Sequence, residues 1–153
     1  MPIKMQVTGL DELQARFSKF PQAYNRNVKL TLKGALLTLW ENVPPYPPEP
    51  PNSSYDRQGI LGKSLGSSEQ GGKGFGEPDI YEIAKQGERF MHGDFGTRLK
   101  YAPFVIGDYE QAERMSYWWT IKDIAIDSKD KIVRLFQQMV RDLARFLDGK
   151  GML

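Results

Sequence analysis

The sequence predicts an α+β fold, in which a small antiparallel β-sheet with a long β-hairpin packs against two N-terminal helices and one C-terminal helix. Apolar residues recur every three or four positions over residues 10–43 and again over residues 132–147, which is the spacing of amphipathic helices. At residues 79–84 and 97–101, polar and apolar residues alternate instead, which is typical of strands. We find no internal repeat, so a single domain is expected over residues 1–153.

The composition is that of one packed domain, because the 153 residues include 40% hydrophobic residues. The chain has no apolar run of about eighteen residues and no N-terminal signal-peptide pattern, so we expect neither a membrane span nor secretion. The absence of cysteine excludes disulfides and fits assembly in a reducing cytoplasm. A net charge of +2, from 21 basic and 19 acidic residues, gives no overall case for binding nucleic acid.

Two helices are expected before residue 44. Leu10, Leu13 and Phe17 predict the first, over residues 9–19. Pro21 is expected to open the second, over about residues 22–42, because proline is tolerated at a first helical position. Its apolar face comprises Tyr24, Val28, Leu32, Ala35, Leu36, Leu39 and Val43.

The middle of the chain is expected to hold loops and the hairpin. Six prolines in residues 44–51 predict an extended polyproline segment, and the Gly-rich residues 67–78 predict a flexible loop. Residues 60–65 are compatible with a strand or a single helical turn. Strands are predicted at residues 79–84 and 97–101, the second continuing into the apolar Phe104, Val105 and Ile106, with Pro103 marking an edge or a break.

The C-terminal helix has the clearest pattern. Asp127 or Ser128 is expected to cap it, and Gly149 and Gly151 to end it. Its apolar stripe comprises Ile132, Leu135, Phe136, Met139, Val140, Leu143 and Phe146 or Leu147.

No catalytic residue, cofactor site or metal site is predicted. His92 with Asp94 and a distant serine could form a catalytic triad, but no G-x-S-x-G motif occurs, and we interpret His92 as an exposed loop residue. The acidic groups Asp108, Glu110, Glu113 and Asp123, Asp127, Asp130 lack the pattern of a calcium loop. No helix is expected to follow the Gly-rich residues 71–76, which argues against phosphate binding.

Aromatic residues are concentrated between Tyr101 and Trp119. They could form a platform that binds sugars or stacks on bases, but core and subunit interface is the favoured interpretation, since aromatics dominate both. The basic residues of the last helix are interpreted as a solvated or interfacial face rather than a membrane-binding one.

Several short motifs, in order, resemble a known family. They are a segment at residues 7–13 before a long helix, Gly59-Ile60-Leu61-Gly62-Lys63-Ser64 after a proline-rich loop, and Tyr101–Val105, followed by residues 107–112 and Trp118-Trp119-Thr120. This arrangement is similar to the small tail-completion, minor tail or head–tail joining proteins of long-tailed bacteriophages (the HK97 gp10-like family). Gln58 departs from the family's usual threonine at that position.

The resemblance implies a structural virion protein, not an enzyme, that forms a homo-oligomeric ring, with a hexamer as the expected size, at the tail–neck junction. It would be assembled in the host cytoplasm, with no membrane contact, and would complete the tail or join it to the head. Its partners would be further copies of itself and the tail terminator, tail tube and head-connector proteins, and non-specific contact with DNA in the lumen stays open. The family supplies no catalytic or cofactor residues.

Assembly arms are expected at residues 44–58 and 66–97. We expect the loop 44–55 and the aromatic region 101–119 to supply opposite sides of the subunit contact. The candidate interface residues are Tyr46, Tyr55, Tyr101, Phe104, Tyr109, Trp118 and Trp119. Two alternatives stay open: a small carbohydrate- or protein-binding module that uses the Tyr/Trp cluster, and a hydrolase that uses His92.

Overall fold

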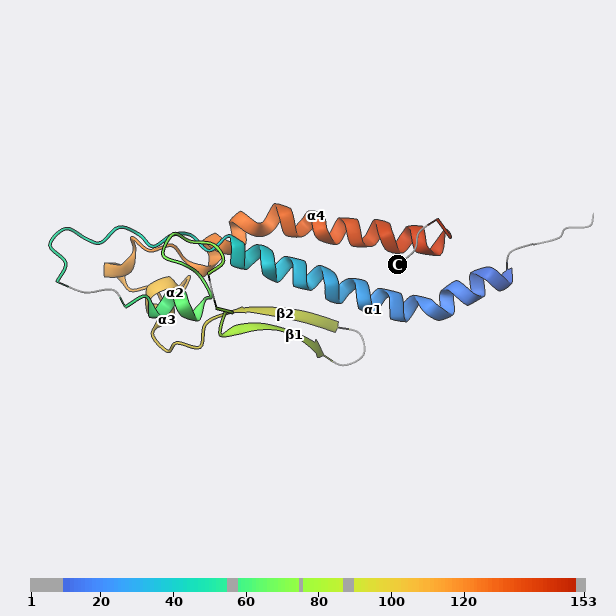
Figure 1. Ribbon diagram of the computed structural model, residues 1–153, viewed down its shortest axis with the longest axis horizontal. Helices are drawn as coiled ribbons and strands as arrows, with labels where there is room; N and C mark the ends of the chain where they lie inside the picture. Colours follow the sequence, from blue (N-terminus) through green and yellow to red (C-terminus); the bar gives the residue numbers. More distant parts are fainter. Residues whose placement is uncertain (1–9, 55–57, 75, 87–89, 151–153) are drawn as a thin grey trace, which may run out of the picture.

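The computed structural model describes residues 10–54, 58–74, 76–86 and 90–150. Its elements are α1 (Leu10–Glu41), α2 (Ile60–Ser64), β1 (Ile80–Gln86), β2 (Phe90–Gly96), α3 (Ala102–Ile106), the 3₁₀ turn η1 (Glu113–Met115) and α4 (Ile121–Leu147). Figure 1 shows an elongated molecule in which α1 lies between α4 and the β1–β2 hairpin, while the short elements gather where α1 ends. The mixture of helices with an antiparallel sheet confirms the α+β class. None of the described helices is both long and apolar enough to cross a membrane.

One continuous N-terminal helix replaces the two that the sequence predicts. Pro21 lies inside α1 rather than at the start of a new helix. A proline in a helix costs one backbone hydrogen bond and crowds the carbonyl four residues earlier, but its fixed φ is itself helical. The helix therefore bends rather than ends, and Figure 1 shows α1 bent in its blue, N-terminal part.

The two long helices run antiparallel and pack closely. Gly34 of α1 permits this, because a Cβ there would lie 3.3 Å from Cδ1 of Leu135 in α4. Just after the C-terminal end of α1, the Asn42 side-chain amide donates to the fully buried Ser128 hydroxyl (3.0 Å). The predicted stripe of α4 is correct for buried Leu143 and wrong for exposed Val140.

The N-terminus of α4 lies further upstream than predicted. Thr120 is the N-cap: its hydroxyl accepts from the Asp123 backbone N–H (3.3 Å), and the Asp123 carboxylate accepts from the Thr120 N–H (2.7 Å). This capping box satisfies the first turn, so Asp127 and Ser128 lie inside the helix. At the other end Gly149, with φ of +74°, follows the last turn as predicted, whereas Gly151 lies outside the described residues.

The first predicted strand is confirmed as β1, but the second was placed too late in the chain. The partner strand is Phe90–Gly96, paired antiparallel with β1 so that Ile83 lies opposite Gly93. A Cβ on Gly93 would lie 3.2 Å from Cγ of Leu36, so this glycine lets α1 lie against the sheet. Residues 97–101 form no strand, and the apolar run that follows is the helix α3, with Pro103 in its first turn.

The Gly-rich segment after α2 is packed against α1, contrary to the prediction of a flexible loop. The buried Trp40 indole donates to the Gly66 carbonyl (2.7 Å), and the Gly72 N–H donates to the Val43 carbonyl (2.7 Å). Gly71 adopts a φ of +83°, which favours glycine. The assembly role expected for residues 66–97 stays a prediction. Hydrogen bonds join the Gly-rich part of this segment to α1 and to Val43 just after it.

Candidate functional site

A small apolar core supports the end of the molecule at which the short elements meet. Residues 60–65 form a helical turn, one of the two predicted alternatives, and Leu61 and Leu65 pack with Ala102 and Ile106 of α3. The Gln111 side-chain amide donates both to the Val105 carbonyl (2.8 Å) and to the Trp118 carbonyl (3.0 Å). These contacts bring α2, α3 and the segment around η1 together as one support.

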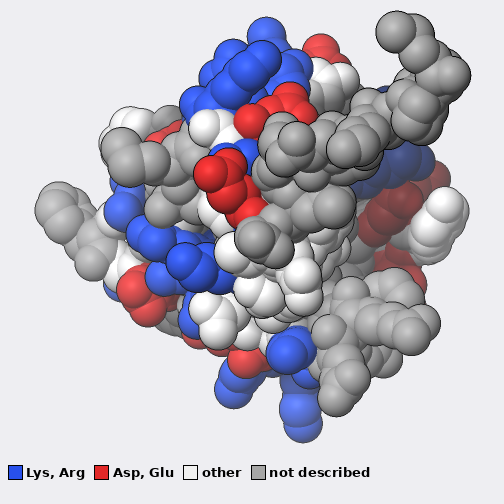
Figure 2. All heavy atoms as spheres, turned by 90° about the vertical axis from the view of Figure 1, so that its right-hand side faces the viewer, with Lys and Arg blue, Asp and Glu red and all other residues white. Residues whose placement is uncertain are grey.

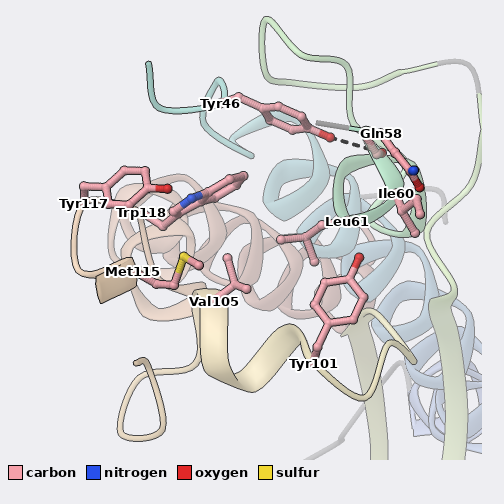
Figure 3. Close-up of a pocket in the computed structure, with 10 residues that line it drawn as sticks. Tyr46, Gln58, Ile60, Leu61, Tyr101, Val105, Met115, Tyr117 and Trp118 are labelled. Carbon is pink, nitrogen blue, oxygen red and sulfur yellow. Dashed lines mark hydrogen bonds between the residues drawn. The ribbon is translucent and has the colours of Figure 1, made fainter. Parts of the chain in front are cut away.

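A pocket of about 310 Å³ lies on this support (Figure 3). Four aromatic side chains dominate its wall, and no Asp, Glu, Lys, Arg or His is among the residues that line it. The lining residues are Tyr46, Gln58, Gly59, Ile60, Leu61, Tyr101, Val105, Met115, Tyr117 and Trp118. The volume is at the lower end of the range for ligand sites, and the neutral, aromatic lining suits an uncharged apolar group.

Hydrogen bonds to α2 fix the Tyr46 wall of the pocket. Its hydroxyl accepts from the Gly62 N–H (2.9 Å) and donates to the Gly59 carbonyl (3.2 Å). A Cβ at position 62 would collide with that hydroxyl, so Gly62 gives the ring the room it needs. The Tyr46 ring lies 5.5 Å from the Trp118 ring, at 51°. The wall is therefore set before any ligand binds.

The base of the proline-rich loop belongs to the same aromatic cluster. The Trp119 indole donates to the Pro45 carbonyl (3.1 Å), and the Trp118 and Trp119 rings lie 6.0 Å apart. Pro45 and Tyr46 therefore contact the aromatic region within one chain. That the loop 44–55 and the aromatic region supply opposite sides of a subunit contact stays a prediction.

The structure brings together some of the predicted interface residues and separates others. Tyr46, Tyr101 and Trp118 surround the pocket, with Trp119 beside them. Phe104 and Tyr109 are exposed outside it, Tyr109 at 93%, and Tyr55 lies outside the described residues.

The sequence did not indicate that Gln58, Ile60, Leu61 and Met115 belong to one site with the aromatic residues. Tyr117 was visible in the aromatic concentration, but its position on the pocket was not. The Gly59–Ser64 motif was a usable signal, because its glycines are what the Tyr46 hydroxyl approaches.

His92 lies on β2 rather than in a loop. Its Nε2 is 3.3 Å from Oδ2 of Asp94, and both side chains are about half exposed. In the described part of the chain no hydrogen bond joins His92 to a serine, and the same residues contain no group of three or more His, Cys, Asp or Glu that could hold a metal. The triad hypothesis thus gains nothing from the geometry.

The charged surface is mixed. Figure 2, which views one end of the molecule along its length, shows Lys and Arg side chains interspersed with Asp and Glu. On α4, Lys131 pairs with Glu41 (3.1 Å), and Asp142 accepts from Gln138 (2.8 Å). In this view acidic side chains lie beside both groups of basic ones, at the top and at the left.

Comparisons with known proteins add no family to this description. No protein-family model, no curated protein and no solved structure matches the chain. The resemblance to phage tail-completion proteins therefore stays a prediction from the motifs, and the aromatic pocket is the strongest candidate site in the described residues.

Proposed function

We propose that the chain is a structural subunit of a long-tailed bacteriophage virion, assembled into a ring at the tail–neck junction, where it completes the tail or joins it to the head. Further copies of itself and the tail terminator, tail tube and head-connector proteins are its proposed partners. The order of the short sequence motifs is the reason for proposing a virion protein. The observation that carries the assembly role is the amount of surface that a single copy leaves exposed.

The exposed area is large for the mass. The chain exposes 11,527 Å², whereas a compact monomer of 17.5 kDa exposes about 7,900 Å². An excess of about 1,000 Å² remains even when the nineteen residues outside the described ranges are given the area of a fully extended chain. A standard interface buries about 800 Å² of each partner, so the excess is of the size that association removes.

Apolar side chains contribute to this surface on several elements. Phe17, Leu30, Phe104, Tyr109, Ile126, Val133 and Val140 are all exposed. They are distributed over α1, α3, the segment after it and α4. A ring subunit needs two different contact surfaces, one for each neighbour, and exposed apolar groups on separate elements fit that requirement.

The sheet also supports association. Among the described residues, β1 and β2 pair only with each other, so each strand has one open edge. Two-stranded sheets are marginal alone, and open edges can pair with strands of another chain. A neighbouring subunit could therefore extend this sheet.

A second candidate function is a monomeric module that binds carbohydrate or a protein segment through the Tyr/Trp cluster. The pocket favours it, because sugars and peptides stack on aromatic side chains of this kind. The ring predicts that the functional form is an oligomer, whereas the binding module predicts a monomer.

Light scattering across a range of protein concentrations, alone and with the tail-tube protein, tests the proposal. We expect a species of several subunits, or one that forms only with the tube. Val140→Asp is expected to weaken it if α4 lies in a contact, and Lys129→Asp, a charge change on the same helix, serves as the matched control. A monomer at all concentrations that ignores the tube contradicts the ring and leaves the binding module.

A further inference from the structure

The proline-rich loop beyond Tyr46 has a periodic pattern. In Pro47-Pro48-Glu49-Pro50-Pro51, two overlapping P-x-x-P pairs occur, Pro47 with Pro50 and Pro48 with Pro51. A polyproline helix has three residues per turn and rises about 3.1 Å per residue, so the members of a pair stack about 9 Å apart on one edge. Two edges of the segment then carry prolyl rings, while Glu49 occupies the third.

This segment extends away from the body. Residues 43–50 form no helix or strand, and residues 48–54 are exposed. In Figure 1 the teal loop that follows α1 reaches beyond the helices at the left end of the molecule. The loop turns only after the prolines, where Asn52 has a φ of +65° and the Ser53 N–H donates to the Pro50 carbonyl (3.1 Å).

The pocket has the chemistry that such a segment requires. Polyproline segments bind grooves lined by aromatic side chains, and because they are already extended they lose little entropy on docking. Figure 3 shows Tyr117 and Tyr101 on opposite sides of the cavity, with Trp118 and Tyr46 between them and above. Prolines offer carbonyl acceptors but no N–H, and the Gln58 side-chain amide on the wall has N–H donors.

The segment lies outside the pocket of its own chain, because Tyr46 lines the pocket and none of residues 47–51 does. Pro47 directly follows Tyr46, whose ring is a wall of the pocket and whose N–H donates to the Glu69 carbonyl (3.0 Å). Each proline fixes φ near −65°, which favours an extended course for the run. A second copy can supply the segment that this chain keeps outside its own pocket.

We propose that the aromatic pocket of one subunit receives the segment 47–51 of the next, in a head-to-tail contact. This inference deepens the proposed ring and rests on it for the presence of a neighbouring copy. The donor and acceptor surfaces differ, so the contact is heterologous and leaves one free surface of each kind until the ring closes. It also explains why Tyr46 and Trp118 are fixed within one chain: they form the receiving site.

Two variants change the two surfaces separately. The pocket variant is Tyr101→Ala with Tyr117→Ala, both 44% exposed, and the loop variant is Pro50→Ala with Pro51→Ala, both exposed. The controls are Tyr101→Phe with Tyr117→Phe, which keeps the rings, and Ser54→Ala in the same loop. We expect each alanine pair to weaken association about tenfold or more, the loss typical of interface hot spots, and the controls to weaken it far less.

Mixing the two variants gives the decisive measurement, by native mass spectrometry, with the tail-tube protein present if assembly needs it. A pocket variant retains an intact loop and a loop variant retains an intact pocket, so a mixture should form a dimer with one contact and grow no further. Independent monomers in the mixture, or wild-type assembly by both variants, overturn the docking. The second result leaves the proposed ring intact.

A peptide of residues 44–54 tests the docking even if the wild-type chain does not assemble. It is titrated into the chain while tryptophan fluorescence is recorded with excitation that avoids tyrosine. We expect saturable binding that the pocket variant and a peptide with alanine at positions 50 and 51 both lose. Absence of binding to the wild type overturns the docking, whereas binding by a persistent monomer overturns the ring and keeps the pocket as a polyproline site.

Discussion

The two halves of the molecule are held together in different ways. In the body, formed by α1, α4 and the hairpin, apolar side chains pack over glycines and small residues, as Leu36 does on Gly93 and Leu135 on Gly34. In the lobe, formed by α2, α3 and the loops around them, polar tips of large side chains reach backbone groups, as the Tyr46 hydroxyl and the Gln111 amide do. The body therefore depends on shape, and the lobe depends on a few directed hydrogen bonds.

This difference matters for function. Packing of periodic elements tolerates exposed variation on the outer faces, which suits a scaffold. Directed bonds in loops fix the position of single side chains, which suits a recognition site. The pocket lies in the lobe, where the Tyr46 ring is fixed by bonds at both Gly59 and Gly62.

Trp40→Ala should have the largest effect, because Trp40 joins the two halves. It is 4% exposed, its indole donates to Gly66 in the lobe, and its ring packs on Tyr81 of the hairpin at 5.3 Å. We expect a loss of about 3–5 kcal/mol in the free energy of unfolding, measured in urea. Trp40→Phe should lose less, since it keeps a ring and gives up the indole N–H. A loss below about 1 kcal/mol for Trp40→Ala would show that the halves are stable without this link.

Gly93→Val tests the shape dependence of the body. The added Cβ would lie 3.2–3.3 Å from three atoms of Leu36, so we expect a loss of about 1–3 kcal/mol in unfolding free energy as the hairpin shifts from α1. Gly96→Val is the matched control in the same strand, because its Cβ would meet only Cδ1 of Ile80, at 3.9 Å. Equal losses for the two variants would contradict the role of Gly93 in the approach of α1.

Tyr46→Phe tests the directed bonds of the lobe. The change keeps the ring but leaves the Gly62 N–H without its acceptor, and we expect a loss of about 1–2 kcal/mol. The tryptophan fluorescence should also change, since the Tyr46 ring contacts Trp118. Tyr109→Phe, at a position 93% exposed, is the control and should leave both readouts unchanged. Stability like that of the wild type in Tyr46→Phe would show that the pocket wall does not need its hydrogen bonds.

The body could be predicted from the sequence to a greater extent than the lobe. Periodic apolar residues predicted most of α1, the strand β1 and the course of α4, because burial of one face imposes a period. The second strand was missed because Gly93 and Gly96 carry no strand signal of their own, and Gly93 is placed by its contact with Leu36 of α1. The cap of α4 was missed although Thr120 and Asp123 have the spacing of a capping box.

In the lobe, the composition indicated which residues matter but not how they are arranged in space. The aromatic concentration was visible, but the apolar run of α3 is too short for periodicity to distinguish strand from helix. Tyr46 reaches Trp118 from 72 positions away in the chain, a contact that no local pattern encodes. The pocket could be seen only when the loops were placed in space.

The smallest expected effect concerns the boundary between the halves at high pH. Partial burial, with the carboxylates of Glu77 and Glu41 nearby, raises the pKa of Tyr81 above its ordinary value. The folded state therefore favours the protonated phenol, so the contribution of Tyr81 to stability is complete below about pH 10 and falls as the pH rises through the raised value. Tyr81→Phe keeps the ring against Trp40 and removes the titration. Urea unfolding from pH 8 to 11 should show the wild type losing more stability above pH 10 than the variant, although lysines and other tyrosines titrate in both. Parallel curves would mean that the Tyr81 phenol titrates alike in the folded and unfolded chain, and would contradict a raised pKa at the junction where Trp40 joins the hairpin to the lobe.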